Sequence, residues 1–287
     1  MSAPSSLQPP RERTQTLSGW DQTVYDYAAD TPRAAVLMVH GLGEHFGRYE
    51  HVARYWTSES CCVYGFDHYG HGKSTGLRGH SPGWELLLGQ IDAVRGLIEA
   101  DLGHELPIVL FGHSFGGLLS LSYLDRRSTP AGSLAAAIIS APALQLGFTP
   151  SPALLSVARL GGKLVPRLRL PNEIELAALS RDPAVASAFA ADPLTYNRIS
   201  ARLASELLSE STRLRTKGSD FEPPCLLIHG DADRVCHVDG SRKFALQSTA
   251  PITLRIWSGH FHELHNEPDY LNVLTYSSEW LRQHLQA

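Results

Sequence analysis

The chain has 287 residues, a length that suits one large α/β domain carrying an insertion. Hydrophobic residues make up 43% of it, which allows a sizeable core, whereas charged residues make up 19% and the formal net charge is -4. This balance excludes the basic face that nucleic-acid binding requires, so we expect no nucleic-acid partner. The four cysteines form no CxxC pair, and we expect buried free thiols in a reducing compartment.

The amino-terminal segment is polar and rich in proline. Residues 1–19 contain no apolar stretch of the kind found in a secretory signal, and we expect them to form a tail. No apolar run in the sequence reaches the roughly 18 residues that a membrane-spanning helix needs. The expected location is therefore the cytoplasm, with any membrane contact being peripheral, and the sequence leaves the oligomeric state open.

Six short apolar runs predict the strands of a central sheet. Most of them are apolar throughout rather than alternating, which is typical of strands that helices cover on both faces. In chain order the runs are residues 34–40, 61–67, 107–113, 134–140, 224–230 and 253–259.

Helix-like segments separate these runs. The clearest is residues 84–100, where apolar side chains recur at steps of three and four residues. Further helices are expected over residues 115–125, 239–249 and 268–284. Strands that alternate with helices predict a doubly wound, mostly parallel α/β sheet.

One long segment breaks this alternation. From residue 144 to residue 219 we expect no strand, only short helices that prolines separate. We interpret this segment as a helical cap, or lid, inserted into a core formed by residues 20–143 and 220–287. Open α/β sheets bind ligands at the carboxyl edge of their strands, so the cap is expected to lie over that edge.

Part of the expected cap carries an apolar helical stripe. Over residues 152–165 the stripe includes Leu154, Val157 and Val165, while Lys163 lies on another side. Two interpretations stay open: the helix packs on the main domain, or its surface makes transient contact with lipid aggregates or a membrane. Cap helices rich in Leu and Ala also suit an acyl chain, of which each buried CH₂ contributes ~0.8 kcal/mol.

A candidate nucleophile stands in a glycine-rich turn. The sequence from Gly112 to Gly116 fits the pattern G-x-S-x-G, with Ser114 at its centre, an expected strand before it and an expected helix after it. A sharp strand-to-helix turn strains the central residue, and its close neighbours must lack side chains, which explains the glycines. Such a turn raises the Ser114 hydroxyl above the sheet edge and directs the N–H of Phe115 toward developing negative charge.

A serine hydroxyl needs a general base, and the base needs a group that orients it. Two carboxylates follow the fifth expected strand, and three histidines follow the sixth. In chain order these candidates are Asp231, Asp233, His260, His262 and His265. Both clusters are expected at strand ends, where they can converge on Ser114, but spacing alone does not choose among them.

A turn after the first expected strand can supply a second oxyanion donor. The sequence VHGLGEHFGRY places an HG turn there, and the backbone N–H of Leu42 is the expected donor. The later run HFHELH has the spacing of a metal cluster, but no further carboxylate pattern accompanies it. We therefore expect neither a metal nor a cofactor.

In this order, the motifs resemble those of the monoacylglycerol lipase and lysophospholipase branch of the α/β-hydrolase superfamily. HGLGEHFGRY is similar to the family's oxyanion loop HGxGEHxGRY, and GHSFGG matches its nucleophile turn. HGDADRVC matches an acid loop of the form G-x-x-D-R, and GHFHELHNE matches a histidine loop of the form G-x-x-H-x-x-x-x-E. The resemblance runs from about Gly19 to the C-terminus and is weakest over residues 144–170.

The resemblance implies roles that spacing left open. It gives the acid role to Asp233 and the base role to His262. It also implies that Glu44, Arg48 and His265 line the pocket for the alcohol part of an ester. The implied fold is the α/β-hydrolase fold with a helical cap between two strands.

The implied activity is that of a serine ester hydrolase that cleaves monoacylglycerols to glycerol and fatty acid through an acyl-enzyme. Its partner is then a small lipid ester. A lysophospholipase or a carboxylesterase of broad specificity is the alternative within the same chemistry. A non-catalytic ligand-binding protein of this fold is a further alternative, although such proteins usually lack one of the three catalytic side chains.

Overall fold

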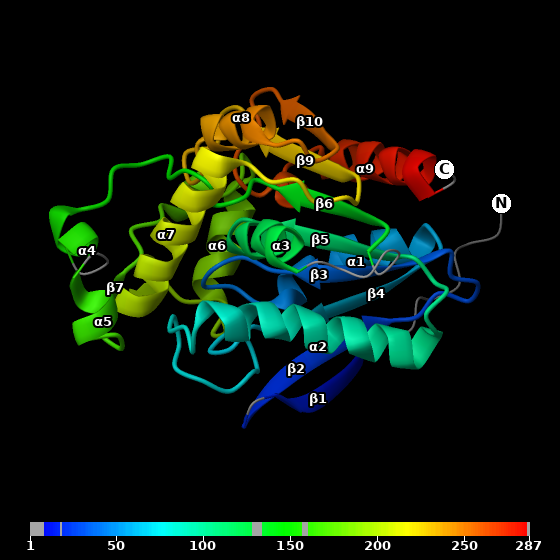
Figure 1. The fold of residues 1–287 in the computed structure, drawn as a ribbon, viewed down its shortest axis with the longest axis horizontal. Coiled ribbons are helices and arrows are strands. Elements are labelled where there is room, and N and C mark those ends of the chain that lie inside the picture. The colour runs from blue at the N-terminus through cyan, green and yellow to red at the C-terminus, as the bar shows by residue number, and fades with distance from the viewer. Residues whose placement is uncertain (1–8, 18, 128–133, 157–159, 286–287) are drawn as a thin grey trace.

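One large sheet organises the fold. The computed structural model describes residues 9–17, 19–127, 134–156 and 160–285, and eight strands of this part of the chain form the sheet (Figure 1). They are β1 (Arg11–Leu17), β2 (Trp20–Tyr27), β3 (Ala34–Val39), β4 (Cys61–Phe66), β5 (Ile108–His113), β6 (Ala136–Ser140), β9 (Cys225–Gly230) and β10 (Ile252–Trp257). Their spatial order is β1-β2-β4-β3-β5-β6-β9-β10. β2 runs antiparallel to β1 and β4, and the other neighbours are parallel, so the predicted mostly parallel sheet is confirmed.

The six apolar runs predicted as strands are confirmed as β3, β4, β5, β6, β9 and β10. Every residue of β5 and of β9 is buried, as strands in the middle of a sheet with two covered faces require. β10 has one neighbouring strand, and its residues are mostly half-buried.

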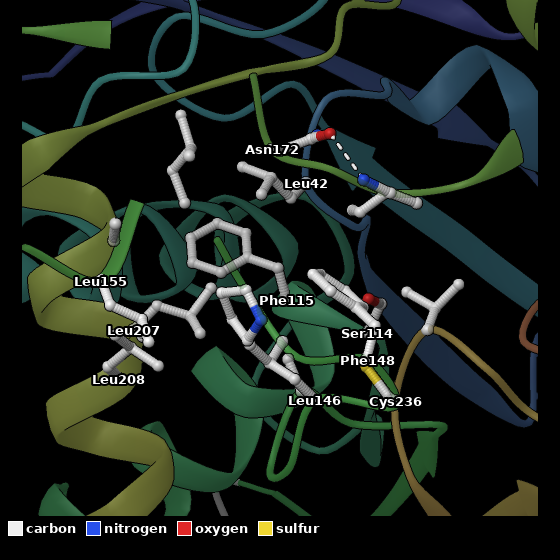
Figure 2. Close-up of a pocket in the computed structure, with 16 residues that line it drawn as sticks. Leu42, Ser114, Phe115, Leu146, Phe148, Leu155, Asn172, Leu207, Leu208 and Cys236 are labelled. Atoms are coloured by element: carbon white, nitrogen blue, oxygen red, sulfur yellow. Dashed lines mark hydrogen bonds between the residues drawn. The ribbon is translucent and has the colours of Figure 1, made fainter. Parts of the chain in front are cut away.

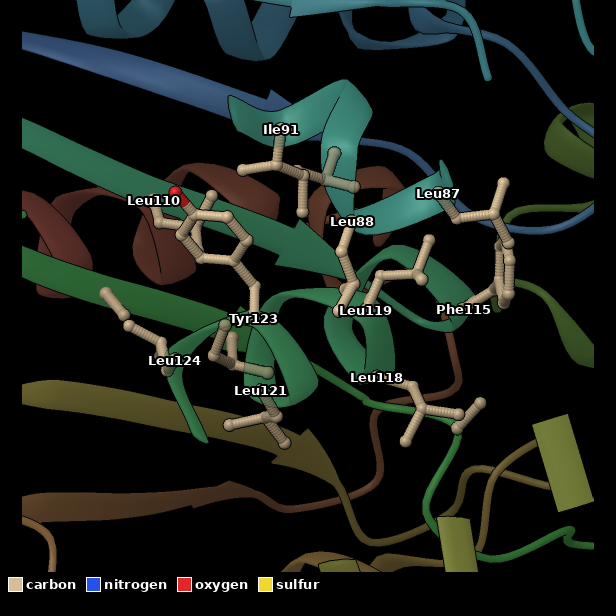
Figure 3. Close-up of a cluster of buried hydrophobic side chains, with 14 of the residues drawn as sticks. Leu87, Leu88, Ile91, Leu110, Phe115, Leu118, Leu119, Leu121, Tyr123 and Leu124 are labelled. Atoms are coloured by element: carbon tan, nitrogen blue, oxygen red, sulfur yellow. The ribbon is translucent and has the colours of Figure 1, made fainter. Parts of the chain in front are cut away.

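Helices cover both faces of the sheet. They are α1 (Glu50–Ser58), α2 (Trp84–Leu102), α3 (Phe115–Arg126), α8 (Val238–Gln247) and α9 (Tyr270–Leu285), and all except α1 were predicted. α2, α3 and α8 pack on one face, where Leu88, Leu119 and Leu110 belong to one buried cluster (Figure 3). α1 and α9 pack on the other face through Trp56 and Leu281. α1 is not among the predicted helices, although Val52, Ala53 and Trp56 give its sequence an apolar face at helical spacing.

The amino-terminal tail expected over residues 1–19 is wrong for Arg11–Leu17, which forms β1. β1 pairs with β2 along its full length, and Gly19, with φ +84°, lies in the connection. The strand is missed because its sequence, RERTQTL, is polar and half-exposed, as suits the edge of a sheet. Residues 1–8 and 18 lie outside the described residues.

Between β6 and β9 the chain leaves the sheet and forms a layer at the carboxyl ends of the strands (Figure 1). Its elements are α4 (Pro152–Ser156), α5 (Gly162–Leu164), β7 (Arg169–Pro171), α6 (Pro183–Ala191), β8 (Arg198–Ser200) and α7 (Ala201–Lys217). The expectation of no strand in this segment is wrong, because β7 and β8 pair as an antiparallel ribbon. Strands of three residues are too short to leave a pattern in the sequence. Short 3₁₀ helices cover Phe46–Tyr49, Leu176–Ala178 and Leu264–Asn266.

α7 is anchored to the core through a buried carboxylate. Glu210 accepts hydrogen bonds from Ser122 Oγ at 2.6 Å and from Arg126 Nη2 at 2.5 Å, both on α3. Removing either partner leaves a buried charge incompletely satisfied, which is costly. The helix is therefore held in place where it forms one wall of the site described below.

The apolar stripe expected over residues 152–165 lies partly outside the described residues, because 157–159 are not among them. Within the described part, Leu160 and Leu164 are 69% and 81% exposed, and Val165 and Leu168 are exposed beside them. These two leucines therefore do not pack on the main domain. No helix of the described chain combines the length and the apolar character that crossing a bilayer requires.

Candidate active site

The turn between β5 and α3 carries Ser114 in a strained backbone conformation, with φ 54° and ψ -117°. The turn is also tightly packed. A Cβ on Gly112 would lie 2.4 Å from Ser120 Oγ, and one on Gly116 would lie 2.1 Å from the carbonyl oxygen of Val39. These close approaches explain both glycines and position the serine at the carboxyl end of β5.

Ser114, His262 and Asp233 form a continuous chain of hydrogen bonds. Nε2 of His262 lies 2.9 Å from Ser114 Oγ, and its Nδ1 lies 2.7 Å from Asp233 Oδ2. Because Nδ1–H donates to the carboxylate, Nε2 is unprotonated and accepts the hydroxyl proton of the serine. The three residues follow β5, β10 and β9, respectively. This is the arrangement of a nucleophile, a general base and a group that orients the base.

The chain around Asp233 fixes the orientation of its carboxylate. Oδ1 accepts the N–H groups of Val235 and Cys236 at 2.8 and 2.9 Å, and buried His229 lies 3.2 Å from Oδ2. Burial acts to raise the pKa of Asp233, but the charge of His262 and hydrogen bonds from both histidines hold it well below its usual range. Burial acts to lower the pKa of His262, and the Asp233 carboxylate raises it above its usual value. The buried carboxylate is therefore placed to stabilise a positive charge on the imidazole of His262.

Asp231 and His260, the other candidates for the acid and the base, have hydrogen-bond partners elsewhere. Asp231 accepts the N–H of Gly259 at 2.6 Å, and His260 Nε2 lies 3.2 Å from the carboxylate of Asp269. Neither takes part in the hydrogen-bonded chain to the serine. The structure thus brings to the nucleophile turn the acid and the base that the family resemblance implies.

Two backbone N–H groups at the site, those of Leu42 and Phe115, donate to no other group of the described residues. Leu42 follows β3, and Phe115 is the first residue of α3, where N–H groups lack partners within the helix and the dipole favours negative charge. Glu44 Oε1 accepts the N–H of Gly41 at 2.6 Å and so fixes the loop that carries Leu42. Both donors are available to an oxyanion.

Two cavities meet at Ser114. The larger has about 660 Å³ of empty space, part of it open to solvent, and its wall is mostly apolar. Figure 2 shows Leu207 and Leu208 of α7 on one side of it and Ser114 with Cys236 on the other. The smaller, of about 420 Å³, has a more polar wall, to which Glu44, His113, Asn197, His262 and Glu263 contribute.

A cluster of charged side chains lies at the wall of the smaller cavity. Arg48 donates to Glu44 from Nη1 and forms a two-point pair with Glu263, with N···O distances of 2.8 and 2.7 Å. The hydroxyl of Tyr49 donates to Glu44 at 2.7 Å. Burial acts to raise the pKa of Glu263, but Arg48 lowers it to about 2, so this pair is ionised.

Of the three residues that the resemblance assigns to the alcohol pocket, one lines a cavity in the structure and two do not. Glu44 lines the smaller cavity. Arg48 and His265 line neither cavity, and His265 is 2% exposed, with its ring centre 4.8 Å from that of His113. The assignment of Arg48 and His265 to the alcohol pocket stays a prediction, and in this structure they contact the wall residues Glu263 and His113.

Two contacts join the segment between β6 and β9 to the oxyanion loop. The N–H of Tyr196 donates to the carbonyl oxygen of Gly43 at 2.9 Å, and His45 Nε2 lies 2.8 Å from Asp192 Oδ2. Gly43 has φ +76°, and a Cβ there would lie 2.3 Å from the carbonyl oxygen of Tyr196. The segment therefore helps to hold the loop that carries Leu42.

Sequence reasoning missed two polar residues of the site. Glu263 follows the base His262 directly, but its partner Arg48 lies 215 residues earlier in the chain. The one sequence signal for Glu263 is an acidic residue inside an otherwise buried histidine loop. Asn172 lies in the segment between β6 and β9 and lines both cavities, and no spacing rule marks it.

Comparisons with known proteins agree with this geometry. A family model described as serine aminopeptidase, S33, matches residues 30–269. The chain is 34% identical to the monoacylglycerol lipase of Mycolicibacterium smegmatis, over 93% of this chain and 95% of that protein. It is 35% identical to an uncharacterized abhydrolase domain-containing protein of Dictyostelium discoideum over 99% of this chain, but it spans only 29% of that relative's length.

A solved structure supports the same grouping. The crystal structure of Paleococcus ferrophilus monoacylglycerol lipase is similar with a TM-score of 0.80 and 32% identity, covering 91% of this chain and 99% of that chain. The family model covers most of the chain, and the sheet topology and the nucleophile turn agree with it. The chain therefore belongs to the serine aminopeptidase S33 family of α/β-hydrolase fold, in its monoacylglycerol lipase branch.

Proposed function

We propose that this protein is a serine hydrolase that cleaves monoacylglycerols to glycerol and free fatty acid. One observation carries the proposal: the hydrogen-bonded chain of Ser114, His262 and Asp233 ends where an apolar cavity meets a more polar one. A monoacylglycerol has the same division, with an acyl chain on one side of its ester bond and a hydroxylated alcohol on the other. Its relatives include proteins named monoacylglycerol lipase.

The proposed reaction needs only groups of the chain and water. Ser114 Oγ attacks the acyl carbonyl carbon while His262 Nε2 takes its proton, and Asp233 stabilises the resulting imidazolium. The N–H groups of Leu42 and Phe115 hold the oxyanion of the tetrahedral intermediate. The intermediate collapses to an acyl-enzyme when the imidazolium gives its proton to the leaving glycerol oxygen. Water, activated by the same histidine, then releases the fatty acid and restores the serine.

Residues 144–219 serve as the cap in this proposal, and Leu207 and Leu208 of this segment face the acyl chain. Each CH₂ that enters the larger cavity contributes about 0.8 kcal/mol, so a long chain binds mainly there. Glu44 in the smaller cavity is placed to accept a hydrogen bond from a glycerol hydroxyl.

The profile of rates over several esters tests this function. The enzyme is assayed on monoacylglycerols, on lysophospholipids and on p-nitrophenyl esters of two to sixteen carbons. We expect the highest kcat/KM for a monoacylglycerol. Preference for lysophospholipids would support the lysophospholipase alternative, and preference for esters of two to four carbons would indicate a simple carboxylesterase.

The cap also carries the proposed contact with lipid surfaces. Leu160, Leu164, Val165 and Leu168 are exposed together, and Lys163 and Arg167, exposed beside them, suit anionic head groups. We expect Leu164→Asp to weaken sedimentation with vesicles that contain anionic lipid. Leu246→Asp, at an isolated leucine that is 86% exposed on α8, is the matched control and should leave binding unchanged.

A cytoplasmic location is part of the same proposal. The four cysteines are free and buried, as suits a reducing compartment. Cell fractionation with a compartment marker tests it, and recovery of the protein in a secreted fraction would contradict it.

A further inference from the structure

Asn172 occupies the junction of the two cavities. Of the described residues, five line both: Leu42, Ser114, Asn172, Ile174 and Val235. Three of these side chains are apolar, and Ser114 is the nucleophile. Apart from Ser114, Asn172 is therefore the one polar side chain among these five residues. It lies where the ester bond would join an acyl group in the larger cavity to an alcohol in the smaller one.

Hydrogen bonds fix which end of the Asn172 amide belongs to the protein. Its backbone N–H donates to the carbonyl oxygen of Asn197 at 2.8 Å. Its Oδ1 accepts the N–H of Ile174 at 3.2 Å in an Asx turn, drawn as a dashed line in Figure 2. The intervening Glu173 has φ 61°, and its carboxylate accepts the N–H of Ser151 at 2.8 Å. The Oδ1 atom of Asn172 is thus occupied by a hydrogen bond within its own turn.

The Nδ2 end of the amide has two N–H donors and no partner among the described residues. The residue is 8% exposed, and Nδ2 lies beside the oxyanion loop, 3.8 Å from the point that a Cβ on Gly43 would occupy. Asn172 lines both cavities, so its free amide N–H groups can meet an acceptor there, whereas the neighbouring Leu42 and Ile174 side chains offer none. The acceptor for the Nδ2 N–H groups would therefore come from the bound substrate.

We propose that Asn172 determines specificity for the alcohol part of the ester, by donating a hydrogen bond from Nδ2 to the substrate hydroxyl nearest the ester bond. This rests on the proposed function, because it assigns the donor to the glycerol of a monoacylglycerol. An ester of the same fatty acid with ethanol has no hydroxyl to accept the bond. Asn172 therefore selects between esters that share an acyl chain and leaves the chemistry at the serine unchanged.

Two substitutions separate substrate binding from support of the loop. Asn172→Asp keeps an oxygen for the Ile174 N–H but replaces the Nδ2 donor with a second oxygen, which is ionised at about pH 8. Asn172→Ala removes both groups. Asn272→Asp, on an exposed position of α9 remote from the cavities, is a control with the same change of charge.

The experiment measures kcat/KM of each variant on a monoacylglycerol and on the ethyl ester of the same fatty acid. We expect Asn172→Asp and Asn172→Ala to lose about fivefold to tenfold on the monoacylglycerol, the size of one neutral hydrogen bond, chiefly through KM. On the ethyl ester we expect a change below about twofold, which is smaller than that hydrogen bond provides. Asn272→Asp should match the unsubstituted enzyme on both.

Equal losses on both esters would overturn the proposal, because they would show that Asn172 only supports the loop. Unchanged rates on both esters would overturn it as well. The unsubstituted enzyme tests the proposed function separately. If it hydrolyses the ethyl ester but not the monoacylglycerol, the proposed function fails whatever the variants do, and the donor assignment fails with it.

Discussion

Arg48 and Glu263 form a two-point ion pair that joins segments 215 residues apart in the chain. Arg48 also donates to Glu44, which holds the oxyanion loop through Gly41, and Glu263 directly follows the base His262. One buried guanidinium therefore connects the oxyanion side of the site with the base side.

Arg48→Met leaves two carboxylates in the interior without their cation. We expect the free energy of unfolding to fall by about 3–5 kcal/mol, the range found when one partner of a buried ion pair is removed. Urea denaturation measures it. Arg242→Met is the control, because its partner Asp239 lies on the surface, and this variant should keep nearly the free energy of unfolding of the unsubstituted protein. Similar losses in both variants would contradict a special role for the buried pair.

The pH dependence of hydrolysis should report His262. Its pKa is raised by Asp233, and only the neutral imidazole can take the serine proton. Activity should therefore be present above this pKa and lost as the pH falls through it, with a midpoint of kcat/KM above the ordinary histidine value of about 6.5. A profile measured on a soluble ester checks this, and a midpoint well below 6 would contradict the assignment.

Asp233→Asn removes the charge that raises the pKa of His262. We expect kcat to fall by roughly 10⁴, because the imidazolium is no longer stabilised and the histidine tautomer is no longer fixed. The variant should remain folded, since Oδ1 can still accept the N–H groups of Val235 and Cys236. Circular dichroism checks the fold, and near-normal turnover in a folded variant would exclude Asp233 as the orienting acid.

Most strands of the sheet could be predicted from sequence because a buried strand leaves a short run of apolar residues. β5 and β9 are each apolar at their first four positions, and central strands between two layers of helices need such apolar runs. β1 could not be predicted, because its polar residues become a strand only by pairing with β2. α1 is a different case, because Val52, Ala53 and Trp56 already give its sequence an apolar face at helical spacing.

In the site, too, some residues could be predicted from the sequence and others could not. Ser114 could be identified because its turn requires glycines at fixed positions, and family motifs distinguished Asp233 and His262 from their neighbours. The positions of Arg48 and His265 outside the cavity walls could not be predicted, since a motif gives the residue but not what packs around it. Asn172 ends the sequence RLPN, but its place at both cavities depends on how the segment between β6 and β9 meets the core.

The contact between His45 and Asp192 should affect catalysis through the oxyanion loop. In Asp192→Asn, Oδ1 can still accept the N–H of Leu194, but an NH₂ group replaces the oxygen that faces His45. We expect kcat to fall by about twofold to tenfold, the worth of one hydrogen bond. Asp239→Asn on the surface of α8 is the control. An unchanged kcat for Asp192→Asn would show that this contact does not support the loop.

The larger cavity should set the preferred acyl length. Leu207→Trp adds volume to the wall formed by α7, so we expect long-chain esters to lose at least tenfold in kcat/KM while short-chain esters keep their rates. A series of p-nitrophenyl esters measures the change. Leu246→Trp, at an exposed position of α8, should keep the original profile. Equal losses at every chain length would contradict acyl binding in this cavity.

Turnover of a monoacylglycerol by Ser114→Ala tests the central claim most directly. Loss of the nucleophile of such a triad lowers kcat by about 10⁶, so hydrolysis should fall to the background of the assay while the fold is retained. A folded Ser114→Ala variant that still releases fatty acid at the rate of the unsubstituted enzyme would contradict the account.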